Sequence, residues 1–343
     1  MSRILVRGPL GLVLAEPIDV SYEAAVRAAR KFLRNRDFLH YGSQLIPERL
    51  ESETWSLAWA YVREVDDVID SIDGRSARAV LAREWEKVRA AVGRGAYGGS
   101  RLIRDYWLTY FFRNLDEHYS EGEWKKVYSA IRELYLSALI DAARRGRILT
   151  PGEMVKLLKY KAVAFFKLYF TLGRFKLNGY EDKLAELLGL ALGLLDDFLD
   201  ALYDLKVGYV NLTSDEIAAL RGRGAGMQPP ASKTRLWWPR AAKRRGLAIL
   251  KLLMKARHIA HRVRNPLARK TILRLTEAFA APILEGRFVP GAIYFFKGGK
   301  LLLKLLPRDE MLAYEVGHRM IGTLLSIPQL TPALVKLWVK LIS

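Results

Sequence analysis

The chain has 343 residues, of which 51% are hydrophobic and 27% charged, a composition typical of a folded globular protein that excludes a disordered or collagen-like chain. It carries 56 Lys and Arg against 36 Asp and Glu, a net charge of +20. This excess indicates an anionic partner: a nucleic acid, an anionic membrane surface or a phosphorylated substrate. The chain contains no cysteine, which excludes disulfides, thiolate metal sites and cysteine nucleophiles.

The first element in chain order is an N-terminal arm, residues 1–20, in which we expect a short extended segment. From Tyr22 onward, apolar residues recur at three- and four-residue spacing, which indicates amphipathic helices. Glycine, proline and serine mark the breaks between them. The predicted helices are 22–40, 52–73, 76–92, 100–117, 122–145, 151–176, 181–207, 241–263 and 266–284. The sequence therefore predicts an all-α bundle.

The domain organisation is predicted from these breaks. We expect one helical domain over residues 21–310, with a flexible basic flap at about 221–240, and a C-terminal helical tail over 311–343. Within the domain, Thr150 and Glu153 have the spacing of a capping box, with Pro151 at the first helical position.

No segment has the length and hydropathy of a transmembrane helix, because the longest uncharged stretch, Met320–Val335, contains two prolines. We therefore expect a cytoplasmic protein. The tail segment 331–342 has the pattern of an amphipathic helix with a tryptophan and two lysines. Together with Trp237 and Trp238 in the basic flap, it predicts peripheral contact with an anionic membrane surface. A C-terminal helix that docks on the bundle is the alternative.

Two clusters of aspartates stand on predicted helices. The first comprises Asp66, Asp67 and Asp70, which share one part of a helix surface. In the second, Asp196, Asp200 and Asp204 follow one another at four-residue spacing, beside Asp197, in a very apolar helix. A single cluster of this kind is usually a solvated helix face, but two in a strongly basic chain favour a function.

The chemistry of these clusters predicts a divalent cation. Like charges four residues apart destabilise a helix, and a buried carboxylate needs a compensating cation. Mg²⁺ takes oxygen ligands and is commonly bound by one or two carboxylates together with substrate phosphates. We expect Mg²⁺, for which Mn²⁺ can substitute, with a diphosphate substrate. The predicted metal ligands are Asp66, Asp70, Asp196, Asp200 and Asp204, and Asp67 is a further catalytic candidate.

Other candidates lie near these clusters. Arg63 precedes Asp67 by one turn, so it either contacts a phosphate, as a catalytic and substrate-binding residue, or pairs with Asp67. Weaker candidates for substrate binding are Lys161, Lys167 and Arg174, for which a solvated face is the simpler interpretation. The aromatic residues Phe165, Phe166, Tyr169 and Phe170 either line an apolar tunnel and shield a carbocation, or pack in the core.

The segment Trp59–Asp70, with its Trp-Ala-Tyr-Val-Arg stretch before the aspartates, resembles the first motif of the squalene and phytoene synthase family. Asp196 to Asp204 and the segment 208–216 that follows are similar to its second motif, and Asp37-Phe38 with Leu45-Ile46-Pro47 to its entry segment. The resemblance covers about residues 22–220. It implies an isoprenoid synthase-type helical bundle with a central cavity. The implied reaction is a head-to-head condensation of two farnesyl or geranylgeranyl diphosphates, with loss of diphosphate.

The sequence departs from the family pattern in ways that bear on the product. Asp196 stands where the family often has asparagine, and Thr213 near its usual proline. Bulky residues around Phe165 and Phe166 replace an expected pair of small glycines. NADPH use stays open, because no dinucleotide fingerprint is present.

Three alternatives remain. The segment 193–200 also resembles the second motif of head-to-tail polyprenyl diphosphate synthases, although no Gly-Gly-Lys-x-Arg segment precedes the first motif. The basic charge is compatible with a nucleic-acid-binding helical protein, and a non-catalytic relative is the third alternative. Because two aspartate clusters would repel phosphates without a metal, we expect an enzyme and no nucleic-acid partner.

Overall fold

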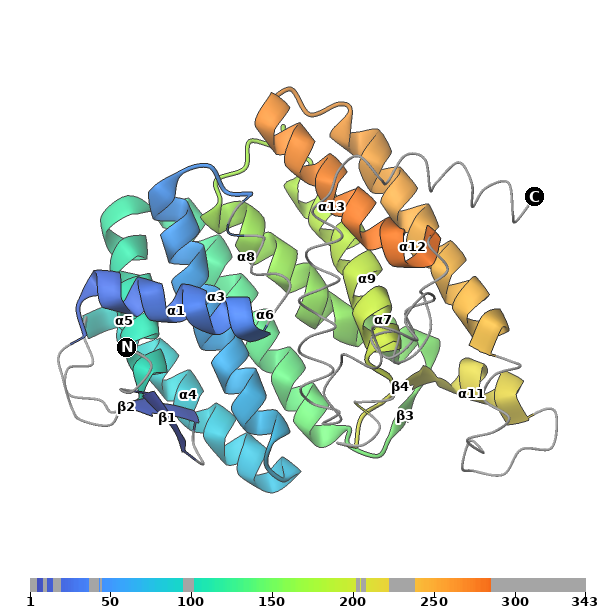
Figure 1. Cartoon of the computed structure of the whole chain (residues 1–343), viewed down its shortest axis with the longest axis horizontal. Helices are drawn as coiled ribbons and strands as arrows, with labels where there is room; N and C mark the ends of the chain where they lie inside the picture. Colours follow the sequence, from blue (N-terminus) through green and yellow to red (C-terminus); the bar gives the residue numbers. More distant parts are fainter. Residues whose placement is uncertain are drawn as a thin grey trace, which may run out of the picture. The chain divides into compact units, whose positions relative to one another are not determined.

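The computed structural model describes residues 5–8, 11–14, 20–36, 43, 45–94, 102–201, 204, 208–221 and 238–284 (Figure 1). The chain divides into two units, and each is described by itself. The first unit takes in Met1–Ala143 and Lys167–Phe175, and the second takes in Arg144–Phe166 and Lys176–Ser343.

The first unit is built around helix α3. It contains the antiparallel strands β1 (Leu5–Gly8) and β2 (Gly11–Leu14) and the helices α1 (Tyr22–Arg36), α3 (Arg49–Asp70), α4 (Gly74–Arg94), α5 (Ile103–His118) and α6 (Glu121–Ala143). Helix α3 packs against α1, α4, α5 and α6. Its first half is buried on every side, and Trp55 and Leu57 are fully enclosed. Burial of such large apolar side chains contributes about 1.5–3 kcal/mol each.

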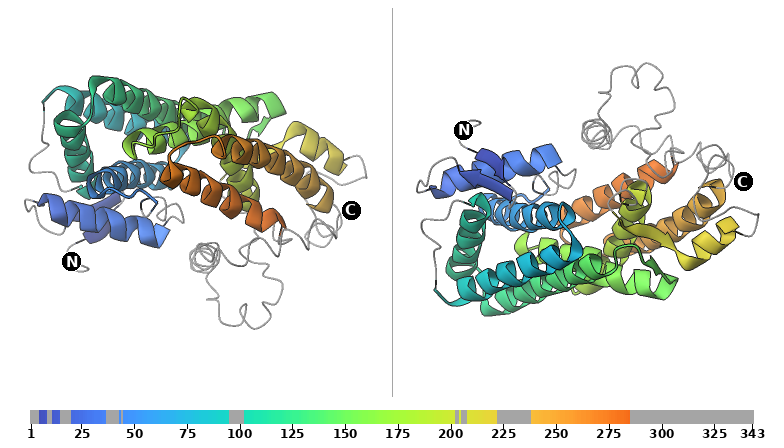
Figure 2. Two further views of the ribbon diagram at one scale, coloured as in Figure 1. Left: turned by 90° about the horizontal axis from the view of Figure 1, so that it is seen from above. Right: turned by 90° about the horizontal axis from the view of Figure 1, so that it is seen from below.

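The second unit is built around helix α9 (Glu181–Leu199). Its other elements are β3 (Ile148–Leu149), α7 (Pro151–Leu158), the π-helix η2 (Lys159–Val163), the start of α8 (Ala164–Leu172), β4 (Val210–Thr213), α11 (Ser214–Arg221), α12 (Trp238–Ala260) and α13 (Pro266–Leu284). Figure 2 shows α9, α12 and α13 side by side, and all three pack on one another. Strands β3 and β4 pair in parallel, with Ile148 opposite Val210.

Two glycines bring α9 unusually close to the π-helix. A Cβ atom on Gly189 would lie 2.6 Å from Val163 Cα, and one on Gly193 would lie 2.5 Å from a methyl carbon of Leu158. Real Cβ atoms do not approach other atoms so closely, so only glycine allows this packing at position 189, where the neighbouring atoms are backbone. The two helices therefore meet one to two turns before the second aspartate cluster. Single-turn π-segments inside α-helices occur frequently at functional sites.

Most predicted helices are present, with ends that shift by a few residues. The predicted helix 151–176 is three consecutive elements, because the π-helix interrupts it, and α9 ends at Leu199 rather than at residue 207. The capping box of Thr150 and Glu153, with Pro151 at the first helical position, is confirmed. The short strands β3 and β4 and helix α11 were not predicted.

Part of the predicted organisation falls outside the described residues. This holds for the tail 311–343, which includes the segment 331–342, and for most of the flap 221–240, which includes Trp237. The N-terminal arm forms a hairpin where it is described, with Leu5 opposite Leu14. Among the described residues, no helix combines the length and hydropathy that a bilayer-spanning segment requires.

Candidate functional site

The first aspartate cluster occupies the C-terminal half of α3, where one face of the helix is no longer fully buried. Arg63, Asp66, Asp67 and Asp70 share this half-buried face. The residues between them, such as Val65 and Val68, point into the core. The period of the α-helix thus places the four charged side chains together, as the sequence predicted.

Arg63 contacts two aspartates of its own helix. Its Nη1 lies 2.7 Å from Asp66 Oδ2, and its Nη2 lies 3.4 Å from Asp67 Oδ1. Of the two interpretations of Arg63, the pair with Asp67 is therefore present, and it extends to Asp66. The guanidinium lies between two carboxylates, about one third exposed, which leaves it accessible to a ligand.

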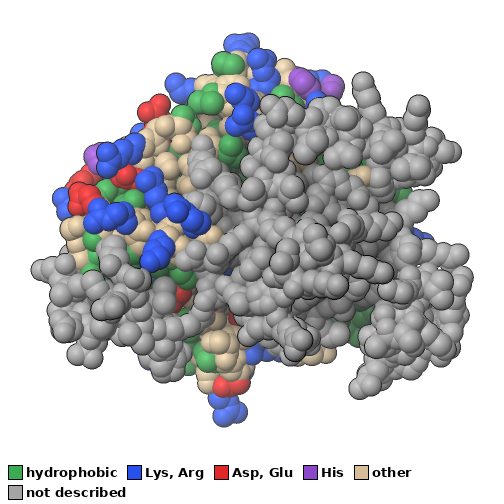
Figure 3. Space-filling model, viewed as in Figure 1, with side chains coloured by type: hydrophobic (Ala, Val, Ile, Leu, Met, Phe, Trp, Pro, Cys, Tyr) green, Lys and Arg blue, Asp and Glu red, His purple; other side chains and the backbone are tan. Residues whose placement is uncertain are grey.

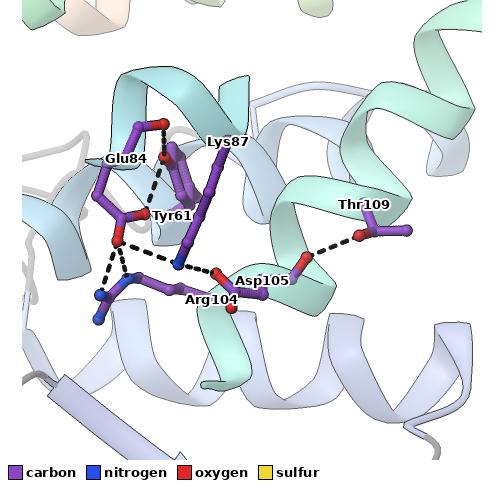
Figure 4. Close-up of polar contacts among 6 residues, drawn as sticks. All are labelled: Tyr61, Glu84, Lys87, Arg104, Asp105 and Thr109. Carbon is purple, nitrogen blue, oxygen red and sulfur yellow. Dashed lines mark hydrogen bonds and ion pairs between the residues drawn. The ribbon is translucent and has the colours of Figure 1, made fainter. Parts of the chain in front are cut away.

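A buried ionic network holds α3 just before the first cluster (Figure 4). Tyr61 on α3 donates a hydrogen bond to Glu84 Oε2 on α4, at 3.2 Å. Glu84 Oε1 accepts from Arg104 Nη2 at 2.8 Å, and Lys87 Nζ lies between Glu84 (3.2 Å) and Asp105 (2.7 Å). Burial alone would raise the pKa of Glu84, but Arg104 and Lys87 hold it below its ordinary value. This network was not predicted, since nothing in a single helix marks these residues as buried.

The second aspartate cluster continues past the end of α9 through backbone hydrogen bonds. The N–H of Asp200 donates to the carbonyl of Asp196, and that of Asp204 to the carbonyl of Asp200, both at 2.9 Å. Asp196, Asp200 and Asp204 are half-buried, and Asp197 is only 4% exposed. The four-residue ladder is therefore present, although α9 itself ends at Leu199.

The carboxylates of this cluster repel one another. Burial raises the pKa of Asp204 well above its ordinary value, and the charges of Asp200, Asp197 and Asp196 raise it further. Lys161, on the π-helix, acts in the opposite direction. The structure thus brings together Lys161 and the second cluster, as a cation that acts on Asp204.

Polar residues that were not predicted as site residues surround Asp204. Asn211 on β4 donates its Nδ2–H to Asp204 Oδ2, and its Oδ1 accepts from Arg144 Nη2 at 2.8 Å. Arg245 on α12 donates to Glu216 at 2.6 Å and to the Asn211 carbonyl at 3.1 Å. The family resemblance drew attention to the segment 208–216, but the arginines come from distant parts of the chain and carry no local signal.

The carboxylate oxygens of the second cluster are the kind of ligand that a hard divalent cation takes. The second cluster offers carboxylate oxygens in a partly desolvated setting, where mutual repulsion favours a bound cation. In the described part of the chain, no group of three or more acidic or histidine side chains is arranged around a single metal position.

Two of the weaker candidates already have protein partners. Lys167 Nζ lies 3.1 Å from both carboxylate oxygens of Glu133. Arg174 contacts Glu51 at 3.0 Å, near the start of α3, and Glu123 at 3.2 Å. Glu51 precedes the first cluster by about 22 Å along α3, at 1.5 Å per residue. Arg174 therefore does not lie with the first aspartate cluster, and we leave it out of the proposed site.

The aromatic candidates are all buried. Phe165 packs edge-to-face on Phe166, with ring centroids 5.1 Å apart, and Phe166 also contacts Phe279. In the first unit, Tyr169 contacts Trp55 at 4.9 Å and Phe170 at 5.9 Å. These contacts account for core packing, and the lining of a substrate tunnel stays a prediction.

Comparisons with known proteins support the fold. No protein-family model and no curated protein matches the sequence. Among solved structures, squalene synthase HpnC from Alicyclobacillus acidocaldarius is similar, with a TM-score of 0.58, 16% identity, and coverage of 80% of this chain and 98% of that chain. A dehydrosqualene synthase in complex with ligand has a TM-score of 0.57 and 12% identity, with coverage of 88% and 98%. The chain has the all-α isoprenoid synthase fold of these enzymes, as the sequence predicted.

Proposed function

We propose that the protein is a Mg²⁺-dependent prenyltransferase that condenses two prenyl diphosphates head-to-head, with loss of diphosphate. The fold it shares with squalene synthase HpnC and a dehydrosqualene synthase supports this reaction class. The motif in α3, from Trp59 to Asp70, supports the same subclass.

The single observation that carries the proposal is the electrostatic state of the second cluster. A half-buried ladder of aspartates that repel one another is costly unless a cation is bound. Mg²⁺ held there would neutralise the diphosphate and stabilise the charge that develops on it as the allylic C–O bond breaks.

Each charged residue has a role in this proposal. Asp196, Asp200 and Asp204 offer oxygen ligands to a divalent cation in the second cluster, and Asp66 and Asp70 do so in the first. Arg63 carries a positive charge to the diphosphate and holds Asp66 and Asp67 in place. Lys161, which already acts on Asp204, adds a second cation for the phosphate oxygens. Lys167 is bound by Glu133 and is a weaker substrate ligand.

The substrates that fit the proposal are farnesyl and geranylgeranyl diphosphate. The test is incubation with each of these and Mg²⁺, with and without NADPH, followed by identification of the products. We expect free diphosphate and a hydrocarbon or cyclopropyl product of twice the chain length, and no turnover in EDTA. Undiminished turnover in EDTA would refute the metal-dependent mechanism.

The same assay separates the alternative subclass. A head-to-tail synthase would consume isopentenyl diphosphate and form a longer allylic diphosphate. Incubation of farnesyl diphosphate with and without isopentenyl diphosphate tests this directly. An allylic diphosphate lengthened by an isopentenyl unit, formed only when isopentenyl diphosphate is added, would favour the head-to-tail reaction and overturn the head-to-head proposal.

We also propose peripheral binding to an anionic membrane surface, which would receive an apolar product. Helix α12 contains no acidic residue, and one face of it exposes Arg244, Leu247, Lys251 and Met254 at helical spacing. Met254 is 70% exposed. Lys, Arg and His side chains gather at the end of the second unit where α12 passes into α13 (Figure 3). A basic face with apolar side chains is suited to a lipid interface.

Vesicle co-sedimentation tests the membrane proposal. We expect binding to vesicles with phosphatidylserine at low salt, loss of binding at high salt, and weaker binding of a Lys251→Glu, Met254→Glu variant. Deletion of residues 331–343 should weaken binding further. Failure of the full-length protein to co-sediment at low salt would show that the membrane proposal is wrong.

A further inference from the structure

The side-chain amide of Asn211 lies between a proposed metal ligand and a buried arginine. Its Nδ2–H donates to Asp204 Oδ2, and its Oδ1 accepts from Arg144 Nη2 at 2.8 Å. Asn211 is 3% exposed and Arg144 is 4% exposed, so water is excluded from the contact between these two residues. The three residues form one hydrogen-bonded chain: Arg144, then Asn211, then Asp204.

Arg144 is itself held on three sides. Its Nη1 donates to the carbonyl of Val210 at 3.3 Å, and its guanidinium carbon lies 5.2 Å from the ring centroid of Tyr209. The backbone nearby is tied by a hydrogen bond from Gly146 N–H to the Gly208 carbonyl, at 2.7 Å. Strands β3 and β4 pair directly after these contacts. These contacts hold Arg144, the first residue of the hydrogen-bonded chain, in place against β4 and the backbone around it.

The direction of this chain is determined by donor and acceptor chemistry. A guanidinium only donates hydrogen bonds, so the oxygen of the Asn211 amide must face Arg144. The amide nitrogen then faces Asp204, and it donates to a carboxylate that only accepts. No other residue type of this size offers an acceptor to one side and a donor to the other in a fixed plane. The arrangement holds Asp204 Oδ2 through the amide of Asn211.

We infer that Asn211 is a positioning residue that orients the Asp204 carboxylate for the metal and diphosphate, and that Arg144 sets the orientation of Asn211. The inference rests on the proposed function, since it assigns a purpose to residues behind the second cluster. Hydrogen-bond partners of metal ligands typically change metal affinity by about 10- to 100-fold when they are removed.

The test measures metal binding rather than turnover. Mn²⁺ is titrated into the full chain in the presence of inorganic diphosphate, and bound Mn²⁺ is followed by electron paramagnetic resonance. We expect Asn211→Ala and Arg144→Gln each to weaken binding by about 10-fold or more. Asn211→Ser, which keeps a small polar group, is measured alongside, and circular dichroism confirms that each variant is folded.

A matched control and a double-mutant cycle separate positioning from a general structural effect. Arg147→Gln removes an arginine three residues from Arg144 whose partner is the exposed Glu153, and we expect wild-type Mn²⁺ affinity. If Asn211 acts through Asp204, Asn211→Ala has no further effect on Mn²⁺ affinity in an Asp204→Asn background.

Each outcome decides the matter. Wild-type Mn²⁺ affinity in folded Asn211→Ala and Arg144→Gln, or full additivity with Asp204→Asn, would overturn the inference while the proposed function stands. Absence of Mn²⁺ binding by the wild-type chain, with or without diphosphate, would overturn both. Weaker binding in both variants together with the non-additive cycle would establish Asn211 and Arg144 as positioning residues.

Discussion

The two aspartate clusters neutralise their charge in different ways. In the first, the cation is Arg63, which belongs to the same helix and lies one turn before the aspartates it contacts. In the second, the groups that act on Asp204 come from other elements: Lys161 on the π-helix lowers its pKa, and Asn211 on β4 donates a hydrogen bond to it. The first cluster is therefore a local arrangement that any isolated α-helix of this sequence would favour, whereas the second depends on the packed unit.

The second cluster therefore needs charge compensation more than the first does. Burial and the charges of Asp200, Asp197 and Asp196 raise the pKa of Asp204, and Lys161 acts in the opposite direction. A bound divalent cation would thus contribute more to the second cluster than to the first, where an arginine is already in place. Substitutions in and around the two clusters test this difference.

The largest effect is expected for loss of one carboxylate in either cluster. We expect Asp200→Asn and Asp70→Asn each to reduce turnover by about 10³-fold, equal to about 4 kcal/mol of activation free energy. The reason is that an amide is a poor ligand for Mg²⁺ and carries no charge. Release of diphosphate from farnesyl diphosphate measures the effect. Asp182→Asn, an exposed position at the start of α9, is the matched control with wild-type turnover expected.

A large effect on stability is expected in the network that holds α3. Glu84→Gln leaves Arg104 buried without its carboxylate, which costs about 3–5 kcal/mol. Because the pKa of Glu84 is lowered in the folded state, its stabilisation is present above the ordinary carboxyl pKa and is lost as the pH falls through the lowered value. The difference in unfolding free energy between wild type and variant should therefore be large at pH 7 and shrink below about pH 4.

Urea unfolding at pH 7 and below about pH 4 measures the difference in unfolding free energy between wild type and Glu84→Gln. Glu86→Gln, two residues along α4, is the control, because Glu86 and Arg89 form a pair whose side chains are 67% and 59% exposed. We expect it to change the unfolding free energy by less than about 1 kcal/mol. Equal effects of the two substitutions would contradict a buried role for Glu84.

A smaller effect is expected where α9 meets the π-helix. Gly189→Ala places a methyl group 2.6 Å from Val163 Cα, so the backbone must shift, at a cost of about 1–3 kcal/mol. Gly122→Ala in α6 is the control, since no atom lies within 4 Å of the place its methyl group would take, and helix propensity favours alanine there by up to about 1 kcal/mol. Thermal unfolding measures the effect. We expect a lower melting temperature for Gly189→Ala and no decrease for Gly122→Ala.

The smallest effect on stability is expected for Arg63→Gln. The pairs of Arg63 with Asp66 and Asp67 are partly exposed, so their loss should cost less than about 1 kcal/mol of unfolding free energy. If Arg63 contacts the diphosphate as proposed, the KM for the prenyl diphosphate should nevertheless rise, because a positive charge is removed. An unchanged KM would show that Arg63 serves its own helix and not the substrate.

Local patterns in the sequence were sufficient to predict much of this protein. The three- and four-residue spacing of apolar side chains predicted α4, α6 and α13 within a few residues, because helical period and burial act over one or two turns. The capping box at Thr150 and the contact of Arg63 with Asp67 were predictable for the same reason. Each depends on residues three or four positions apart.

Contacts between residues far apart in the chain were decided by the tertiary structure alone. Arg144 and Asn211 meet across 67 positions. Arg174 contacts Glu51, which lies 123 positions earlier in the chain and outside the first cluster. The π-helix at Lys159–Val163 likewise depends on close packing against Gly189 and Gly193 of α9, which no pattern within residues 151–176 indicates. The sequence by itself determined which residues become helical and where carboxylates gather, because backbone geometry fixes these locally. Which cation or amide compensates each buried carboxylate depended on how the elements pack, because that pairing is set by distance in space and by exclusion of water.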